Sequence, residues 1–346
     1  MLQDQARHPA ARHRMTIAVL VSLALLALVF SSMLGSVSIP LTELPSALSQ
    51  ILGGRIDSMS ATLLDLRLGR ALSAFVTGGA LALAGVMMQA LVRNPLADPY
   101  VLGISSGAAV GALAALLVGA ALWMIDLGAL CGAVTISLLL YVLARRDLGG
   151  ATQRDVAGDA STLLLTGVIL ASASMALVTL MLSIAPESRL RGMVFWMIGD
   201  LSGAQWRLLP TLVLAAALAF AWRQARSLNV MALHADAAAT LGVNVGVLRR
   251  SLFIVSGLLT ASAVTTAGSI GFVGLIVPHA CRYAFGPDHR LLLPASAIVG
   301  GTFLVLADTL ARTVLAPQQL PVGVLTSLIG VPIFLLQLHQ LHMRRP

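Results

Sequence analysis

RLGRALSAFVTGGALALAGVMMQALVRNPLADPYVLGISSGAAVG, residues 67–111, sets the architecture of this chain. It contains two arginines three positions apart, an apolar stretch long enough to cross a bilayer, a polar turn with two prolines, and a second apolar stretch. The second stretch opens with glycine at every fourth position. This pattern predicts two membrane-spanning helices joined by a short turn.

The composition extends that prediction to the whole chain. Of its 346 residues, 58% are hydrophobic and only 10% are charged, which is too little polar surface for a soluble globule. The apolar stretches are continuous and do not alternate, so we expect helices and not a membrane barrel. The predicted fold is an all-α integral membrane protein with ten transmembrane helices, at about 15–34, 71–91, 101–122, 127–144, 161–184, 207–222, 251–268, 271–286, 291–311 and 321–340.

Arginine counting orients these spans. With a cytoplasmic N-terminus, 15 of the 22 basic residues lie inside and 7 lie outside. Both termini are therefore predicted to be cytoplasmic, with residues 1–14 as a basic tail and residues 15–346 as a single membrane domain. Trp123–Asp126 is expected to break the long apolar run between the third and fourth helices.

All basic residues are arginines, and the missing lysine excludes a phosphate-binding GxxxxGK[ST] loop in this chain. The arginines lie scattered between apolar stretches, so the net charge of +8 does not predict nucleic-acid binding. Cys131 and Cys281 lie in apolar runs and lack a CxxC partner. We expect no disulfide, no metal site, no cofactor and no catalytic residues.

Three patterns carry a choice of interpretations. Gly103, Gly107 and Gly111 share a helix face, which favours close helix packing over the lining of a substrate pathway. The RNPLADP turn, residues 93–99, is stiffened by two prolines and is either a tight hairpin or a contact for a cytoplasmic partner. The third pattern is a set of outside arginines.

Arg67, Arg70 and Arg312 run against the positive-inside bias. Arg67 and Arg70 share a helix face, and Arg312 is expected to end the ninth span on the same side. They either dock an acidic protein surface or, in the case of Arg312, form a local ion pair with Asp308 one turn earlier.

Two further features of the sequence, a cytoplasmic loop and a repeated pattern, bear on how the chain is organised. The loop at about 227–248 has an Ala-rich centre, Met231–Leu241, followed by Gly242 as a helix cap, which predicts a short cytoplasmic helix. The segments GGALALAG, from residue 78, and SGLLTASAVTTAG, from residue 256, each precede a turn and a Gly-Ala-rich span, which suggests an inverted internal repeat.

Six segments together resemble one known family. They are RLGR at 67–70, GALALAGVMMQALVRNPLADPYVLGISSGA at 79–108, GSIGFVGLIVPHACR at 268–282, DHRLLLPASAIVGG at 288–301, ADTLAR at 307–312 and LPVGVLTSLIGVPIFLLQL at 320–338. In these segments the chain is similar to the permease subunits of bacterial ATP-driven importers for ferric siderophores, haem and cobalamin, the FecCD-type or type II importers.

This resemblance implies a homodimeric ten-helix permease in the bacterial inner membrane, surrounded by membrane lipid. It implies cytoplasmic ATPase subunits and a periplasmic solute-binding protein as partners, with the substrate pathway at the dimer axis. The arginines matching Arg67, Arg70 and Arg312 would pair with acidic residues of the binding protein. Coupling to the ATPase would involve Met231, His234, Ala238, Leu241 and Gly242, and the pathway would be lined by Ser161, Thr166, Ser172, Ser174, Thr326 and Ser327.

A secondary transporter or channel that works without an ATPase is the alternative function. Such a carrier needs ionisable groups inside its spans for ion coupling, and the predicted spans offer almost none beyond Asp308. This scarcity favours the ATP-driven importer.

Overall fold

The computed structural model describes residues 9–35, 37–145, 153–233, 238 and 240–343, and within these ranges every regular element is a helix. In chain order the elements are α1 (Pro9–Met33), η2 (Leu41–Glu43), α2 (Leu44–Leu52), α3 (Met59–Val92), η3 (Pro99–Leu102), α4 (Ile104–Val118), α5 (Leu122–Ala144), α6 (Gln153–Ile184), α7 (Glu187–Ile198), α8 (Leu208–Leu233), α10 (Val245–Ala267), α11 (Val273–Phe285), α12 (His289–Thr313) and α13 (Val322–Met343).

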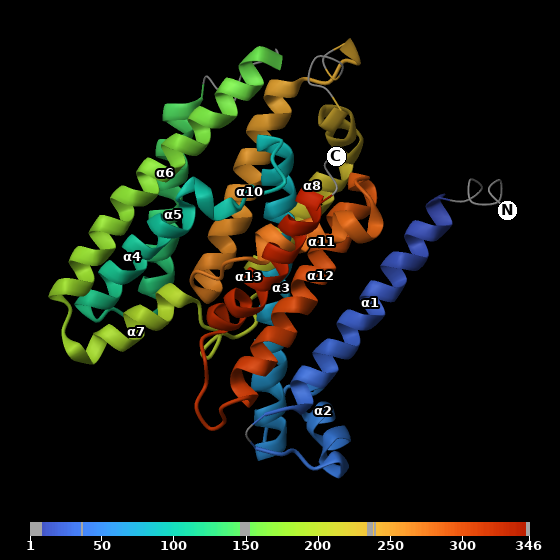
Figure 1. The fold of residues 1–346 in the computed structure, drawn as a ribbon. Coiled ribbons are helices and arrows are strands. Elements are labelled where there is room, and N and C mark those ends of the chain that lie inside the picture. Colours follow the sequence, from blue (N-terminus) through green and yellow to red (C-terminus); the bar gives the residue numbers. More distant parts are fainter. Residues whose placement is uncertain (1–8, 36, 146–152, 234–237, 239, 344–346) are drawn as a thin grey trace.

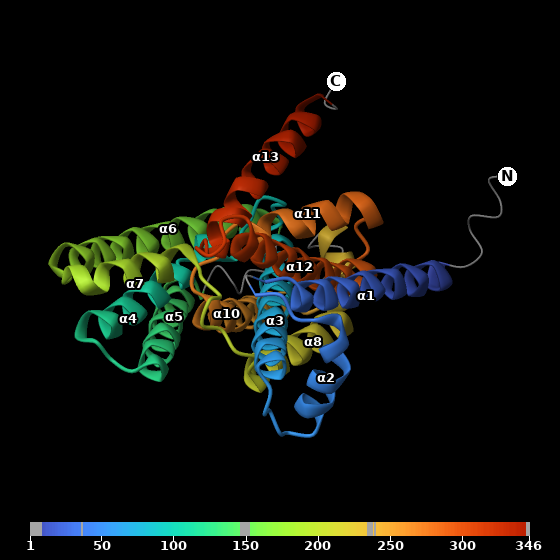
Figure 2. The same ribbon diagram turned by 90° about the horizontal axis from the view of Figure 1, so that it is seen from below.

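Helix α3 is the centre of the molecule. Its most apolar 18-residue window is 89% buried, and it packs against α12, α10, α11, α1 and α8. Figures 1 and 2 show α4, α5, α6 and α7 gathered on one side of α3, with α10 between them and the central helix. The second predicted span, at about 71–91, therefore has neighbours on all sides, although nothing in its own hydropathy distinguishes it from a lipid-facing helix.

Glycine makes this close packing possible. A Cβ added to Gly78 in α3 would lie 2.2 Å from the carbonyl oxygen of Gly300 in α12. A Cβ on Gly85, two turns further along α3, would lie 1.9 Å from the carbonyl oxygen of Gly274 in α11. Backbones meet directly at these points, as is typical of helices that associate in a bilayer by van der Waals contact.

Seven helices in the described ranges are long and apolar enough to cross a membrane, within α1, α3, α5, α6, α8, α10 and α12. Two shorter apolar helices lie at Ile104–Val118 and Val322–Leu336. Each of the ten predicted helices overlaps a helix of the structure, and the all-α prediction is confirmed for the described residues. Ten membrane crossings and the inverted repeat stay predictions.

Three boundaries differ from the sequence-based expectation. Helix α3 begins at Met59 and not at 71, because Ser58 caps it by accepting a hydrogen bond from the backbone N–H of Ala61. The predicted break at Trp123–Asp126 is wrong: these residues lie in α5, and the chain turns at Gly119, whose φ is +72°. Helix α7 is absent from the sequence-based prediction, because its charged first turns make the segment too polar, and its apolar end too short, to be recognised as a membrane span.

Candidate functional site

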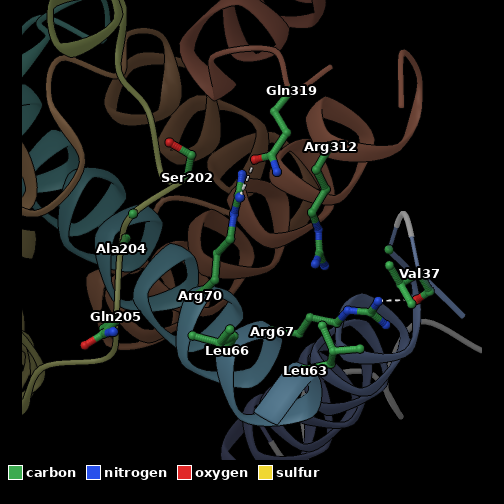
Figure 3. A pocket seen from close by; sticks show the side chains of 12 residues that line it. Val37, Leu63, Leu66, Arg67, Arg70, Ser202, Ala204, Gln205, Arg312 and Gln319 are labelled. Atoms are coloured by element: carbon green, nitrogen blue, oxygen red, sulfur yellow. Dashed lines mark hydrogen bonds between the residues drawn. The ribbon is translucent and has the colours of Figure 1, made fainter. Parts of the chain in front are cut away.

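The three arginines predicted to lie outside meet at one end of the central helix pair. Arg67 and Arg70 lie one turn apart in α3, and Arg312 lies in the last turn of α12. Because α3 and α12 pack along their lengths, the three guanidinium groups come to line one cavity of about 320 Å³ (Figure 3). The remaining lining residues are Gly35, Val37, Leu63, Leu66, Ser202, Gly203, Ala204, Gln205 and Gln319.

Arg70 is held by a buried carboxylate. Its Nε donates to both oxygens of Asp308, at 3.1 and 2.9 Å, and its Nη2 donates to Oδ1 at 2.8 Å. Its Nη1 donates to the side-chain oxygen of Gln319 at 2.7 Å. Asp308 is 1% exposed, so this is a charge-assisted pair shielded from water.

Arg67 and Arg312 instead bind the end of α1. Arg67 donates to the carbonyl oxygens of Met33, at 3.1 Å, and of Val37. Arg312 donates to the carbonyl and hydroxyl oxygens of Ser31, the latter at 2.7 Å. The last carbonyl oxygens of a helix lack intrahelical partners and carry partial negative charge. This explains why those of Ser31 and Met33 accept hydrogen bonds from the two arginines.

The cluster keeps an excess of positive charge. Three guanidinium groups face one carboxylate, because the backbone carbonyls that bind Arg67 and Arg312 are neutral. The Nε of Arg312 lies 3.9 Å from Asp308 and makes no hydrogen bond. The cavity therefore presents a net positive field to whatever approaches it, and a low-dielectric wall strengthens such a field.

The predicted local ion pair between Arg312 and Asp308 is present, but it is not the main contact of Asp308. Asp308 does lie within ion-pair range of Arg312, but its hydrogen bonds go to Arg70. Sequence reasoning missed this pairing, together with Gln319 and Ser31, because the partners are more than 200 residues apart in the chain. Only a pattern of covarying positions could have revealed such contacts.

The glycines predicted for packing lie between α4 and α5. A Cβ on Gly111 would lie 1.9 Å from the carbonyl oxygen of Gly128, and one on Gly107 would lie 2.7 Å from that of Gly132. Gly103 differs from its expected place on the same helix face, because it precedes α4 with a φ of +76° and faces Gly167 of α6.

The predicted pathway residues lie on α6 and α13. On α6, Ser172 is exposed, Thr166 is half-buried and Ser174 is buried, while the side chain of Ser161 lies outside the described part. On α13, Thr326 is buried and Ser327 half-buried, and both hydroxyls donate to the carbonyl oxygen of Gly323. Within the described residues, no extensive contact joins α6 and α13 of one chain.

The predicted coupling residues surround a gap in the described chain. Met231 is buried in α8, Ala238 is buried, and Leu241 is exposed beside Gly242, whose φ is +81°. His234 lies outside the described residues. Of the expected short helix, the structure therefore describes the two ends.

Comparison with known proteins adds three likenesses. The model of the FecCD transport family matches residues 23–340. The hemin transport system permease protein HmuU of Yersinia pestis is 41% identical over 81% of this chain and 83% of its own length. The cobalamin import system permease protein BtuC of Halobacterium salinarum is 40% identical over 81% of this chain and 73% of its own length.

A solved structure described as an inward-facing conformation of a proposed metal-chelate type ABC transporter superposes with a TM-score of 0.81 at 29% identity. It covers 94% of this chain, and this chain covers 99% of that one. The likeness therefore extends over essentially the full length of both chains.

Proposed function

The chain belongs to the FecCD transport family, and on that premise we propose that it is the membrane-spanning permease of an ATP-driven importer for a ferric siderophore or a related large metal chelate such as haem or cobalamin. It takes the chelate from a periplasmic binding protein and releases it into the cytoplasm. The observation that carries the proposal is the positive cavity formed by Arg67, Arg70 and Arg312 at one end of the central helix pair.

Separate subunits hydrolyse the ATP in this proposal. A phosphate-binding loop needs a lysine to reach the nucleotide phosphates, and this chain contains none. The residues that follow α8, among them Ala238 and Gly242, transmit the movement of the ATPase. Two copies of the chain form the complex in the inner membrane with both termini cytoplasmic, and α6 and α13 of each copy face the shared pathway.

The cavity suits the acidic side chains of a binding protein. Its net charge attracts carboxylates over several ångströms before contact, which raises the rate of encounter. The internal partners of Arg67 and Arg312 hold the guanidinium groups in place, so that little side-chain entropy is lost on docking.

The test is charge reversal at Arg67 in the assembled complex of permease, ATPase and binding protein. Arg67→Glu should lower binding-protein-dependent uptake by about tenfold or more while the basal ATPase rate is retained. Arg67→Lys, which keeps the charge, should restore most of the uptake. Arg55→Glu is the matched control, because Arg55 is an exposed arginine on the same predicted side and outside the cavity.

Normal uptake by Arg67→Glu would contradict the docking role. An equal loss of uptake in Arg67→Glu and Arg55→Glu would also contradict it, because the effect would then come from overall charge and not from the cavity.

A further inference from the structure

Within the described residues, helix α1 buries side chains only in its C-terminal half. Its C-terminal half packs on α12 and α3 and buries Ala24, Ala27 and Ser31. Among residues 12–23, by contrast, no side chain is buried. Figures 1 and 2 show α1 diverging from α11 and α12 toward its N-terminus. The divergence leaves a wedge between α1 and the end of α11.

The wedge is an apolar groove of about 240 Å³. Its walls are Met15, Thr16, Val19 and Leu20 of α1 and Phe285 at the end of α11. The only hydroxyl among them, that of Thr16, donates to the carbonyl oxygen of Arg12 and is therefore satisfied within α1. A groove of this composition, opening from a helix that spans the bilayer, favours a hydrocarbon chain as its occupant.

The chain is basic beyond the end of the groove that lies toward the N-terminus of α1. Arg12 precedes Met15 and Thr16 by three and four positions, so it continues the groove face of α1 by one turn. Arg290, in the first turn of α12, is exposed, as is Arg12.

Asp288, the residue before α12, adds one negative charge to this end of the molecule, which leaves Arg12 and Arg290 with a net excess of one positive charge. Burial alone would raise the pKa of Asp288, but the backbone N–H of Arg290, the amide of Asn229 and the charges of Arg290 and His13 hold it below its ordinary value. The groove itself, which joins Met15 of α1 to Phe285 at the end of α11, places the first turns of α1 near the segment that leads into α12. The carboxylate is engaged by Asn229, at 2.7 Å, and by the backbone of Arg290, at 3.0 Å.

We propose that this wedge binds one anionic phospholipid, with an acyl chain in the groove against Val19 and Phe285 and the phosphodiester at Arg12 and Arg290. The groove supplies apolar contact and its basic end supplies charge complementarity. A basic pocket beside spanning helices on the cytoplasmic side is a recognised setting for acidic headgroups. The bound lipid fills the space that α1 leaves open and joins α1 to the end of α11.

The test uses the purified full-length chain in mild detergent, titrated with phosphatidylglycerol, with phosphatidylcholine of the same acyl chains and with inorganic phosphate, and read by native mass spectrometry. Phosphatidylglycerol should bind at least about fivefold more tightly than phosphatidylcholine, because each arginine near an acidic headgroup contributes on this order. Inorganic phosphate should not displace it.

Two variants distinguish the contribution of the lipid headgroup to binding from that of the acyl chain. Arg12→Gln should reduce the preference for phosphatidylglycerol over phosphatidylcholine by about fivefold, whereas Val19→Trp should fill the groove and weaken both lipids. Each has a matched control: Arg55→Gln removes an exposed arginine elsewhere, and Val21→Trp adds the same bulk to α1 outside the groove. Both controls should bind phosphatidylglycerol like the unaltered chain.

Equal affinity for the two lipids would overturn the proposal, and so would test variants that behave like their controls. Displacement of phosphatidylglycerol by inorganic phosphate, with Val19→Trp binding normally, would overturn it as well, because the site would then recognise phosphate alone.

Discussion

At the scale of single residues, the Arg70–Asp308 pair carries the sharpest prediction. Asp308→Asn leaves two guanidinium groups buried without a counter-charge, and breaking such a pair costs about 3–5 kcal/mol. Asp126→Asn is the matched control, because it breaks the exposed Arg207–Asp126 pair, which is worth about 0–1 kcal/mol. Denaturant titration in detergent would measure both losses.

The same pair offers a rescue that identifies the cause. Replacing Arg70 and Asp308 together by leucine removes both charges of this pair, leaves only Arg312 without its carboxylate, and should recover part of the stability lost in Asp308→Asn. If Asp308→Asn costs no more than Asp126→Asn, the buried pair does not stabilise the chain.

Asp98, in the turn before η3, predicts a pH effect. Burial raises the pKa of its carboxyl from 3.8 to about 6, and the hydrogen bond from the backbone N–H of Tyr100 offsets only part of that rise. Between these values the folded chain holds a proton that the unfolded chain has released, so this carboxyl makes stability fall as pH rises.

Asp98→Asn keeps the acceptor for Tyr100 and removes this titration. Melting temperatures measured from pH 4 to pH 7 should therefore fall less steeply for Asp98→Asn than for the unaltered chain. Parallel profiles would show that the Asp98 carboxyl titrates alike in the folded and unfolded chain.

The sequence allowed the arginines of the cavity to be selected, but not their burial to be predicted. Arg67, Arg70 and Arg312 could be selected because outside arginines oppose a general charge bias. Their burial could not be predicted, since it comes from Asp308, Gln319 and the end of α1, which only the fold brings near. A charged residue at the edge of a span looks the same in sequence whether it faces water or a buried partner.

At the scale of helices, the contact of α3 with α11 predicts a steric effect. A methyl group on Gly85 would meet the backbone of Gly274, which cannot rotate away, so Gly85→Ala should lower stability by about 1–3 kcal/mol or more. Gly192→Ala in α7 meets nothing within 4 Å and should be neutral or stabilising. Equal melting temperatures for the two variants would contradict the close packing.

Ala238, in the segment that follows α8, predicts a coupling effect. The carbonyl oxygen of Ala238 accepts the backbone N–H of Val243 at 2.9 Å, and proline at 238 would remove a backbone donor of its own and disturb this turn. Ala238→Pro should release the ATPase or abolish uptake, whereas Ala238→Gly, which keeps the N–H, should do neither. Co-purification and transport assays measure both, and normal uptake by Ala238→Pro would remove this segment from coupling.

Helices were predictable where their hydropathy was uniform and were missed where it was not. The spans at about 161–184 and 127–144 follow from apolar runs that are long enough for a bilayer. The first three turns of α3 contain Asp65 and Arg67, and α7 begins with Glu187 and Arg189, so both read as loop. Tertiary contacts, and not propensity, keep these segments helical.

At the scale of the whole molecule, the proposed dimer predicts a state-dependent pathway. Ser172 lies on the exposed face of α6, so a cysteine there, in a Cys131→Ala background, should react with a thiol reagent at rates that differ about fivefold or more between nucleotide-free and ATP-bound complex. Thr135→Cys, exposed on α5 away from the pathway, should react alike in both states. A constant rate at position 172 would exclude α6 from the pathway.

The backbone contacts at Gly78, Gly85 and Gly111 also bear on how this chain can evolve. Every single-nucleotide missense change in a glycine codon gives a side chain of at least one carbon, and these sites have no space for one. At these positions, every amino acid that one nucleotide change can introduce would clash with the facing backbone. Variation is instead open to sites such as Gly192, so sequence drift in this chain is steered toward its periphery.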